Sequence, residues 1–391
     1  MTNCKFILTK GKNKGQLCNK FNCTNHVKDT NNLTFTTKND YLERYNLLYN
    51  NLPNTQKQKI LKNIDNLNIL EKNSTEFYKN KLFLDNFFSI PFDKTFKINK
   101  EHVLKLESEF DKYIYKMKDV KNELLNYLCK KCTNPDSTKN ILGLYGSPGL
   151  GKTKIVQTLS NILNYPMYTI PLGGVKDSSY LLGHNYTFVE SNYGEIVRGL
   201  IKTQYMNPIF YFDELDKVSD GNNGKEIYSI LTFLTDPSQN LFFKDHYFGS
   251  NDITFDLSKS FFIFTFNDIS KIDSVLLDRI NVINVSEYSC HDKKIILRDY
   301  NLKNILSNVN KDLININFRN ECYDYMLSNH QEFSLREYLF LLEKIVMEIN
   351  KLVFLEKKNI MEFFDIDLTM FKKLHDHVII RKQPSHLSMY I

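Results

Sequence analysis

The spacing of hydrophobic positions changes twice along the chain, and each change marks a different kind of structure. Between residues 40 and 135, apolar residues recur every three or four positions, the spacing of amphipathic helices. From about residue 140, five short apolar runs alternate with helix-length segments, which predicts a parallel sheet covered on both faces. From about residue 290 the helical spacing returns. The predicted strands are 141–145, 167–171, 209–212, 261–266 and 282–285.

Composition narrows the class of protein only a little. The 391 residues are 42% hydrophobic and 25% charged, as in an ordinary globular protein, and the net charge of +6 permits nucleic-acid contact without requiring it. No apolar run approaches the roughly 18 residues that cross a bilayer, and the N-terminus lacks a secretory pattern. With seven unevenly spaced cysteines, we expect a soluble intracellular protein that is neither secreted nor membrane-bound.

The segment after the first predicted strand has a phosphate-binding pattern, G-x-x-x-x-G-K-[ST], and it opens a predicted helix. Glycines let backbone N–H groups converge on phosphate oxygens, and the helix N-terminus adds partial positive charge. We expect Lys152 to reach the β- and γ-phosphates and Thr153 to ligate Mg²⁺. The alternative is a glycine-rich turn that binds nothing. The pattern comprises Gly146, Ser147, Pro148, Gly149, Leu150, Gly151, Lys152 and Thr153.

An acidic pair follows the third predicted strand, where a ligand on an open α/β sheet is expected. We expect Asp213 to hold the metal ion through water and Glu214 to activate an attacking water. Alone, such a pair is as often a solvated turn, but an upstream phosphate loop favours the catalytic interpretation.

Two further polar residues flank the last strands. Asn267 ends the fourth strand and could lie between the γ-phosphate and the catalytic water, or simply cap the strand end. Arg279 precedes the fifth strand and could reach the γ-phosphate on a neighbouring subunit, or form a surface salt bridge.

A chain of collinear signatures between residues 173 and 285 resembles the ATPase module of Lon, the AAA+ protease. Weaker similarity, including the segment 83–92 (FLDNFFSIPF), extends it to about residues 40–375. The signatures are 172–177 (LGGVKD), 183–184 (GH), 207–208 (NP), 212–217 (FDELDK), 236–240 (DPSQN), 245–247 (DHY), 255–259 (FDLSK) and 276–279 (LLDR).

This resemblance implies an AAA+ fold, with five parallel strands followed by a helical lid, and ATP with Mg²⁺ as ligands. It assigns Asn267 as the sensor-1 residue, Arg279 as the arginine finger and Arg336 as the sensor-2 arginine of the lid. An arginine that acts on a neighbouring subunit implies a ring of identical chains, which we expect to be a homohexamer.

The resemblance also predicts how substrate is gripped, and here the sequence departs from the family. Phe188 and Val189 match the aromatic–aliphatic pore loop that holds unfolded polypeptide, although Phe188 taken alone would be predicted in the core. Glu190 replaces the glycine that follows this pair, and Lys116 replaces a glycine in the adenine-side motif. The chain ends at Ile391, near the predicted end of the lid, so we expect an ATPase without the Ser–Lys peptidase of the family.

The N-terminal segment contains a C-x13-C-x4-C-x2-H pattern. Three thiolates and an imidazole would make a closed structural zinc site, and similar small modules occur in proteins of large DNA viruses, which suggests a viral source. The alternative is a basic tail with unligated cysteines, whose lysines solvate the segment or contact nucleic acid. The expected ligands are Cys4, Cys18, Cys23 and His26.

Together, these features predict an ATPase that remodels or unfolds protein substrates. The alternatives are a nucleic-acid-associated ATPase and a nucleotide-gated scaffold with little turnover. The predicted divisions are a zinc module at 1–30, a helical region at 40–135, the nucleotide-binding α/β domain at 136–288, the lid at 289–375 and a tail at 376–391.

Overall fold

The structure is a computed structural model in which the chain divides into two compact units, Met1–Asp93 and Lys94–Ile391. A short antiparallel pair, β1 (Phe6–Ile7) and β2 (Leu17–Cys18), belongs to the first unit. The described residues are 6–7, 17–18, 38–52, 54–72, 74–137, 140–185, 191–219, 221–249, 252–355 and 363–380.

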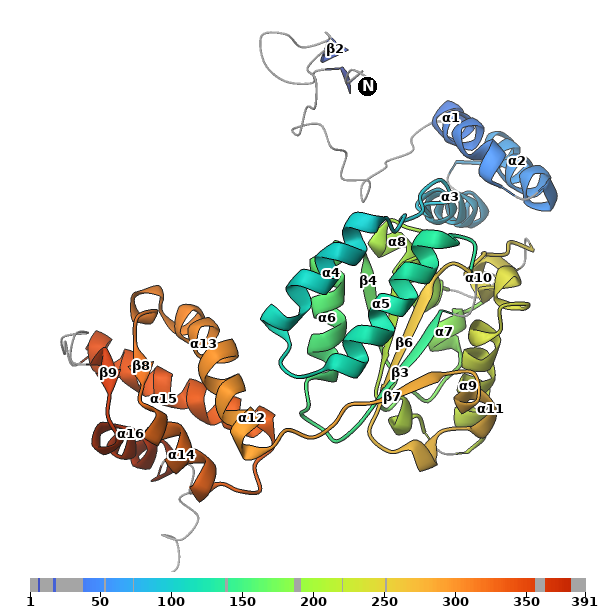
Figure 1. The fold of residues 1–391 in the computed structure, drawn as a ribbon. Coiled ribbons are helices and arrows are strands. Elements are labelled where there is room, and N and C mark those ends of the chain that lie inside the picture. Colours follow the sequence, from blue (N-terminus) through green and yellow to red (C-terminus); the bar gives the residue numbers. More distant parts are fainter. Residues whose placement is uncertain are drawn as a thin grey trace, which may run out of the picture. The chain divides into compact units, whose positions relative to one another are not determined.

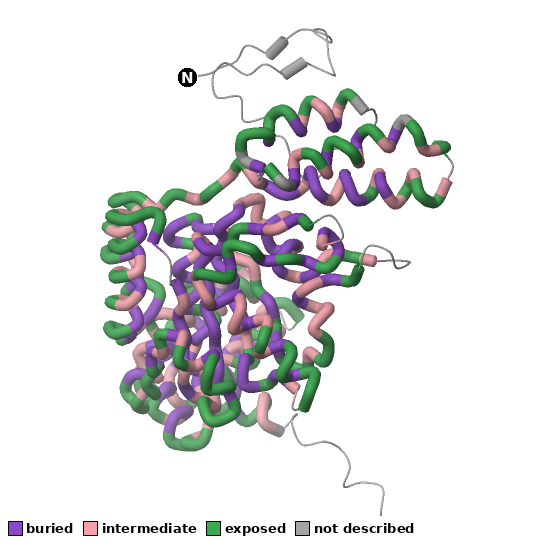
Figure 2. The backbone as a smooth tube through the Cα atoms, turned by 90° about the vertical axis from the view of Figure 1, so that its right-hand side faces the viewer, coloured by how far each residue is buried: buried purple, intermediate pink, exposed green. Residues whose placement is uncertain are grey.

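Among its described residues, the first unit also contains the helices α1 (Lys38–Leu48), α2 (Asn54–Ile69) and α3 (Thr75–Phe88). Their apolar positions recur at helical spacing and are buried where the helices face one another (Figure 2). Tyr41 on α1 donates a hydrogen bond to Asp85 Oδ1 on α3 at 2.6 Å. This bond adds a specific polar contact to an otherwise apolar packing.

The second unit contains the five-stranded parallel sheet that the sequence predicts, in the order β4–β5–β6–β3–β7 (Figure 1). The three central strands are almost continuously apolar and buried, as is typical of a sheet with both faces covered. The strands are β3 (Ile141–Tyr145), β4 (Met167–Pro171), β5 (Ile209–Asp213), β6 (Phe261–Phe266) and β7 (Asn281–Asn284).

Helices cover both faces of this sheet. On one face, Tyr211 and Ile263 share a core with α4 (Lys100–Tyr113), α5 (Lys118–Thr133) and α6 (Lys152–Leu163). On the other face, Phe210 packs against α8. The sequence pattern placed α4 and α5 with the earlier helices, whereas in the structure they belong to the unit of the sheet. The remaining helices of this part are α7 (Ser179–Leu182), α8 (Glu195–Thr203), α9 (Asn222–Thr235), α10 (His246–Gly249) and α11 (Ser274–Leu277).

A second core lies among the C-terminal helices and includes Leu342 and Ile345, which are fully buried. A two-residue parallel pair, β8 (Asn317–Phe318) with β9 (Asp365–Ile366), joins distant parts of this segment. The helices are α12 (Cys290–Ile295), a π-helical turn at Ile296–Asn301, α13 (Leu302–Val309), α14 (Asn320–Asn329), α15 (Leu335–Leu355) and α16 (Leu368–Ile380).

Within the described ranges, no helix combines the length and the apolar character that a bilayer-crossing helix needs.

Candidate functional site

A cavity of about 720 Å³ lies at the carboxyl ends of β3, β5 and β6, where parallel strands expose their ends to ligands. Its size is within the range of small-molecule sites. Side chains from the sheet and from the C-terminal helices line it together. The predicted site residues among them are Pro148, Gly149, Leu150, Gly151, Lys152, Thr153, Asp213, Glu214, Asn267 and Arg336.

The loop from Gly146 to Gly151 connects β3 to α6 and sets the position of Lys152. Gly151 precedes α6 with φ of +87°, a left-handed conformation that favours glycine, so the helix starts with its backbone N–H groups at the cavity. Lys152 Nζ donates to the backbone oxygens of Gly146 at 2.6 Å and Ser147 at 3.0 Å, and to Asn267 Oδ1 at 2.7 Å. The loop lysine and the residue after β6 are therefore in direct contact.

The pKa of the Lys152 amine depends on its burial and on two nearby carboxylates. Burial lowers the pKa of this amine, while the nearby carboxylates of Asp216 and Asp213 oppose the shift. A phosphate ligand would add negative charge beside the amine and so favour its protonated form.

The two residues predicted to hold Mg²⁺ line the same cavity. Thr153 is the second residue of α6, and Asp213 ends β5. Asp213 Oδ1 accepts the hydroxyl of Thr265 at 2.6 Å and the backbone N–H of Glu214 at 3.1 Å. A hydroxyl and a carboxylate facing one cavity are the hard oxygen ligands that Mg²⁺ takes alongside phosphate oxygens and water, so these residues fit the ion.

Glu214 adopts a backbone conformation that is uncommon for a residue with a side chain, with φ of +59°. This turn directs its carboxylate over the end of the neighbouring strand β4. A Cβ atom placed on Gly173 would lie 2.4 Å from Glu214 Oε2, so a side chain at residue 173 would displace the carboxylate from this position.

Arg336 enters the cavity from the start of α15. The Ser334 hydroxyl and backbone N–H both donate to Glu337 Oε2 at 2.8 Å, and the Glu337 N–H donates back to the Ser334 hydroxyl at 3.4 Å. This reciprocal capping fixes the first turn of the helix and with it the origin of the Arg336 side chain.

Comparison with known proteins agrees with this geometry. Residues 142–288 match the family described as "ATPase family associated with various cellular activities (AAA)". A Lon protease homolog of Acanthamoeba polyphaga mimivirus is 34% identical over 267 residues, covering 68% of this chain and 26% of the relative. The Lon protease of Clostridioides difficile is 38% identical over 248 residues (63% and 31%), and that of Borrelia duttonii is 31% identical over 324 residues (80% and 39%).

The chain contains an AAA ATPase domain related to Lon proteases. The predicted resemblance is thereby confirmed. The chain spans between about a quarter and two fifths of the length of these relatives. They come from a virus and from bacteria, and the viral source suggested by the N-terminal pattern stays a prediction.

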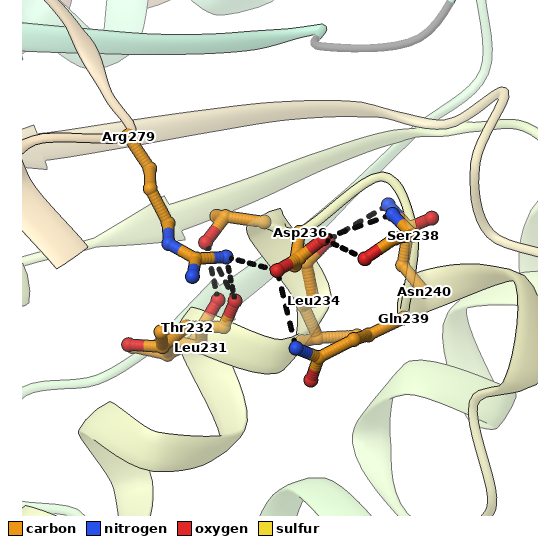
Figure 3. Close-up of polar contacts among 9 residues, drawn as sticks. Leu231, Thr232, Leu234, Asp236, Ser238, Gln239, Asn240 and Arg279 are labelled. Atoms are coloured by element: carbon orange, nitrogen blue, oxygen red, sulfur yellow. Dashed lines mark hydrogen bonds and ion pairs between the residues drawn. The ribbon is translucent and has the colours of Figure 1, made fainter. Parts of the chain in front are cut away.

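Arg279 is not among the residues that line the cavity of the AAA domain. Its Nη1 lies 2.8 Å from Asp236 Oδ2 and donates to the Thr232 carbonyl oxygen at 3.3 Å, at the end of α9 (Figure 3). The hydroxyl and backbone N–H of Ser238, together with Arg279, lower the pKa of Asp236 to about 2. Within a single chain, Arg279 therefore takes part in the salt bridge that the sequence left open as the alternative.

Several residues of the cavity were not singled out from the sequence. Together with Tyr115 and Leu339, they form an apolar and aromatic side that a nucleobase could contact. They are Tyr113, Ile114, Tyr288, Ile296 and Tyr300.

Lys116, which the sequence analysis predicted to depart from the family pattern, adopts φ of +60° beside this apolar side. Its Nζ binds Asp292 Oδ2 at 2.9 Å on α12. Burial opposes ionisation of Asp292, but hydrogen bonds from Lys116 and Ser289 outweigh it and lower the pKa of the carboxyl. The residue that departs from the family pattern thus connects the loop before α5 to the C-terminal helices.

Two sets of predicted residues lie outside the described part of the chain. These are the pore-loop pair, Phe188 and Val189, and the expected zinc ligands Cys4, Cys23 and His26. The fourth expected ligand, Cys18, is described only by its backbone in β2. Among the described residues, no three His, Cys, Asp or Glu side chains gather in a way that could hold a metal ion.

Proposed function

We propose that this AAA domain binds and hydrolyses ATP and that the chain uses the hydrolysis to remodel or unfold protein substrates. The observation that carries the proposal is the convergence of Lys152, Asn267, Asp213, Glu214 and Arg336 on one cavity. These residues come from three adjacent strand ends and from the C-terminal helices. A glycine-rich turn with no ligand would not require that convergence.

Each residue then has a defined task. Lys152 and the backbone N–H groups at the start of α6 bind the phosphates, and Thr153 with Asp213 holds Mg²⁺, which neutralises phosphate charge when bound. Glu214 accepts a proton from the attacking water, and Asn267 positions that water. Arg336 contributes positive charge from α15, so nucleotide binding would bring the C-terminal helices and the sheet to the same ligand.

In the proposed mechanism, Arg279 acts on the nucleotide of a second copy of the chain. Because it lies outside its own cavity, it would reach the γ-phosphate of a neighbouring subunit, which implies a ring and, by analogy with the family, a homohexamer. The Asp236 carboxylate would hold the guanidinium ready at the edge of the subunit.

The AAA domain and the segments around it are proposed to have separate roles. We assign residues 136–288 to the nucleotide-binding domain, 289–375 to the lid, 376–391 to a tail, and 40–135 to a helical region whose last two helices, α4 and α5, pack with the sheet. The segment 1–30 is proposed to bind zinc through Cys4, Cys18, Cys23 and His26, and Phe188 with Val189 is proposed to grip substrate. Zinc content of the purified protein, measured before and after substitution of Cys18 by serine, tests the first of these assignments.

The function is tested by a steady-state ATPase assay on the purified chain, alone and with casein or DNA added. Turnover that rises with casein supports protein remodelling. Turnover that rises only with DNA, and loses this response at high salt, replaces it with the nucleic-acid-associated alternative. Negligible turnover despite tight ATP binding contradicts hydrolysis and favours a nucleotide-gated scaffold.

A further inference from the structure

A line of three hydroxyl contacts runs beneath the proposed magnesium site. The Tyr211 hydroxyl lies 3.0 Å from Thr153 Oγ1 and 3.3 Å from Thr265 Oγ1, and Thr265 Oγ1 lies 2.6 Å from Asp213 Oδ1. The two residues proposed to hold Mg²⁺, one on α6 and one on β5, are therefore connected through Tyr211 and Thr265.

Which atom donates in each hydrogen bond of this line follows from its last member, the Asp213 carboxylate. An ionised carboxylate only accepts, so Thr265 donates its single hydroxyl proton to Asp213. Thr265 then has no proton left for Tyr211, so Tyr211 donates to Thr265. Because the Tyr211 proton is donated to Thr265, the Tyr211 oxygen accepts the proton of Thr153. All three hydroxyl protons thus point away from the cavity side of Thr153 and toward Asp213.

This order has a chemical consequence at Thr153. With its proton engaged by Tyr211, the Thr153 oxygen can present a lone pair to the cavity, and a lone pair is what a metal ligand must offer. At the other end, the bond from Thr265 fixes one oxygen of Asp213 and leaves the second carboxylate oxygen to act toward the cavity. One chain of hydroxyls orients both groups.

The line of hydroxyl contacts is held rigidly because its two central residues are inside the protein. Tyr211 is fully buried and Thr265 is 1% exposed, on the adjacent strands β5 and β6. A buried hydroxyl without a partner is costly, which keeps each member of the chain in place.

We propose that Tyr211 is a positioning residue for Mg²⁺ binding, acting through Thr153 directly and through Thr265 on Asp213. The inference rests on the proposed function, because it assumes that these two residues hold Mg²⁺ with a nucleotide. It differs from a packing role, since a phenylalanine at this position would fill the same space but would leave the Thr153 hydroxyl without its acceptor and the Thr265 oxygen without its donor.

The test compares nucleotide affinity with and without Mg²⁺ in wild type and in Tyr211→Phe. The probe is AMP-PNP, and its dissociation constant is measured by calorimetry in Mg²⁺ and again in EDTA. Partners behind metal ligands typically change metal affinity by 10–100-fold. We expect the gain in AMP-PNP affinity caused by Mg²⁺ to be about tenfold smaller in Tyr211→Phe than in wild type. The affinity in EDTA should be unchanged.

Matched variants separate positioning from stability. Tyr165→Phe also removes a buried phenol, whose hydroxyl donates to the Asn207 carbonyl at 3.0 Å away from the cavity, and it should keep the wild-type response to Mg²⁺. Thr265→Val should reproduce the effect of Tyr211→Phe, and Thr265→Ser, which retains the hydroxyl, should restore the response.

Two outcomes would overturn the proposal, and they are distinguishable. If Mg²⁺ increases the affinity for AMP-PNP equally in wild type and in Tyr211→Phe, Tyr211 has no positioning role while the proposed function stands. If wild type itself gains nothing from Mg²⁺, the assignment of Thr153 and Asp213 as ligands fails, and the role of Tyr211 fails with it.

Discussion

At the residue scale, the geometry of Glu214 depends on a neighbour that has no side chain. Its left-handed backbone directs the carboxylate to a position 2.4 Å from where a Cβ atom of residue 173 would lie. Strained conformations of this kind persist where the surrounding structure holds them, and they cluster at functional sites. Gly173 on the neighbouring strand end is therefore part of the arrangement that aims Glu214.

Gly173→Ala should displace the Glu214 carboxylate and lower kcat without weakening ATP binding. A misplacement of about 1 Å can lower the rate of a reaction by about 100-fold, so we expect a loss of about 10–100-fold in kcat. The measurement is ATP turnover together with the dissociation constant for ATP.

Gly249→Ala is the matched control, because a Cβ atom there meets nothing within 4 Å. It should leave kcat unchanged. A Gly173→Ala protein with wild-type kcat would show that the position of Glu214 does not depend on Gly173.

Residue roles that follow from a local motif could be predicted from the sequence, whereas those that need a distant partner could not. The phosphate loop could be predicted because its spacing is specific, and the acidic pair because that loop lies upstream of it. Tyr211 stands in an apolar run and resembles any buried strand residue until its hydroxyl is placed beside Thr153. Lys116 and Asp292 are 176 positions apart, so no sequence window contains both.

At the scale of elements, a buried carboxylate joins two helices of the sheet domain. Asp245 is fully buried, and it accepts the backbone N–H of Gly194, just before α8, at 2.7 Å and that of Tyr247 in α10 at 2.9 Å. Burial raises the pKa of Asp245 to about 7, although these backbone donors oppose the shift. The position of α8 relative to α10 therefore depends on a carboxyl that titrates near neutrality.

This raised pKa makes stability depend on pH with a defined sign. Between the unfolded value of about 4 and the folded value of about 7, the folded state binds more protons at this site, so stability falls as pH rises. Relative to Asp245→Asn, wild type should lose on the order of 2–4 kcal/mol of unfolding free energy between pH 4 and pH 7.

Urea unfolding of both proteins across this pH range measures the difference. Other carboxyl groups titrate in both proteins and cancel in the comparison. Parallel pH profiles for the two proteins would contradict the raised pKa.

The elements themselves were largely predictable, and their packing partners were not. Each predicted strand is present, with ends that agree within one residue, because runs of four to six mostly apolar residues between helices have few other uses. Helices α4 and α5 carry an ordinary amphipathic pattern, which indicates a buried face but not what covers it. Their association with α6 and the sheet became evident only in three dimensions.

At the scale of the whole molecule, the proposed ring requires that one chain complete the site of another. Arg279 stands outside the cavity of its own chain, whereas Lys152 stands inside it. A chain without Arg279 and a chain without Lys152 would thus lack different halves of a shared site.

Arg279→Ala and Lys152→Ala should each be nearly inactive in ATP hydrolysis, because an arginine acting between subunits contributes about 10³–10⁵-fold to the rate. Mixed in equal amounts, they should regain measurable turnover, because some neighbours then pair an intact Lys152 with an intact Arg279. The measurement is ATPase activity against mixing ratio, with each variant alone as the control. A mixture that stays at the level of the separate variants would restrict Arg279 to its salt bridge with Asp236.

The substitution Glu214→Gln tests whether Glu214 activates water for ATP hydrolysis in this cavity. The substitution keeps the size of the side chain and removes its ability to take a proton. We predict that the variant binds ATP with the wild-type dissociation constant while its turnover falls by about 10²–10⁴-fold, the contribution of a general base. Unchanged turnover in a protein that still binds ATP would contradict the account.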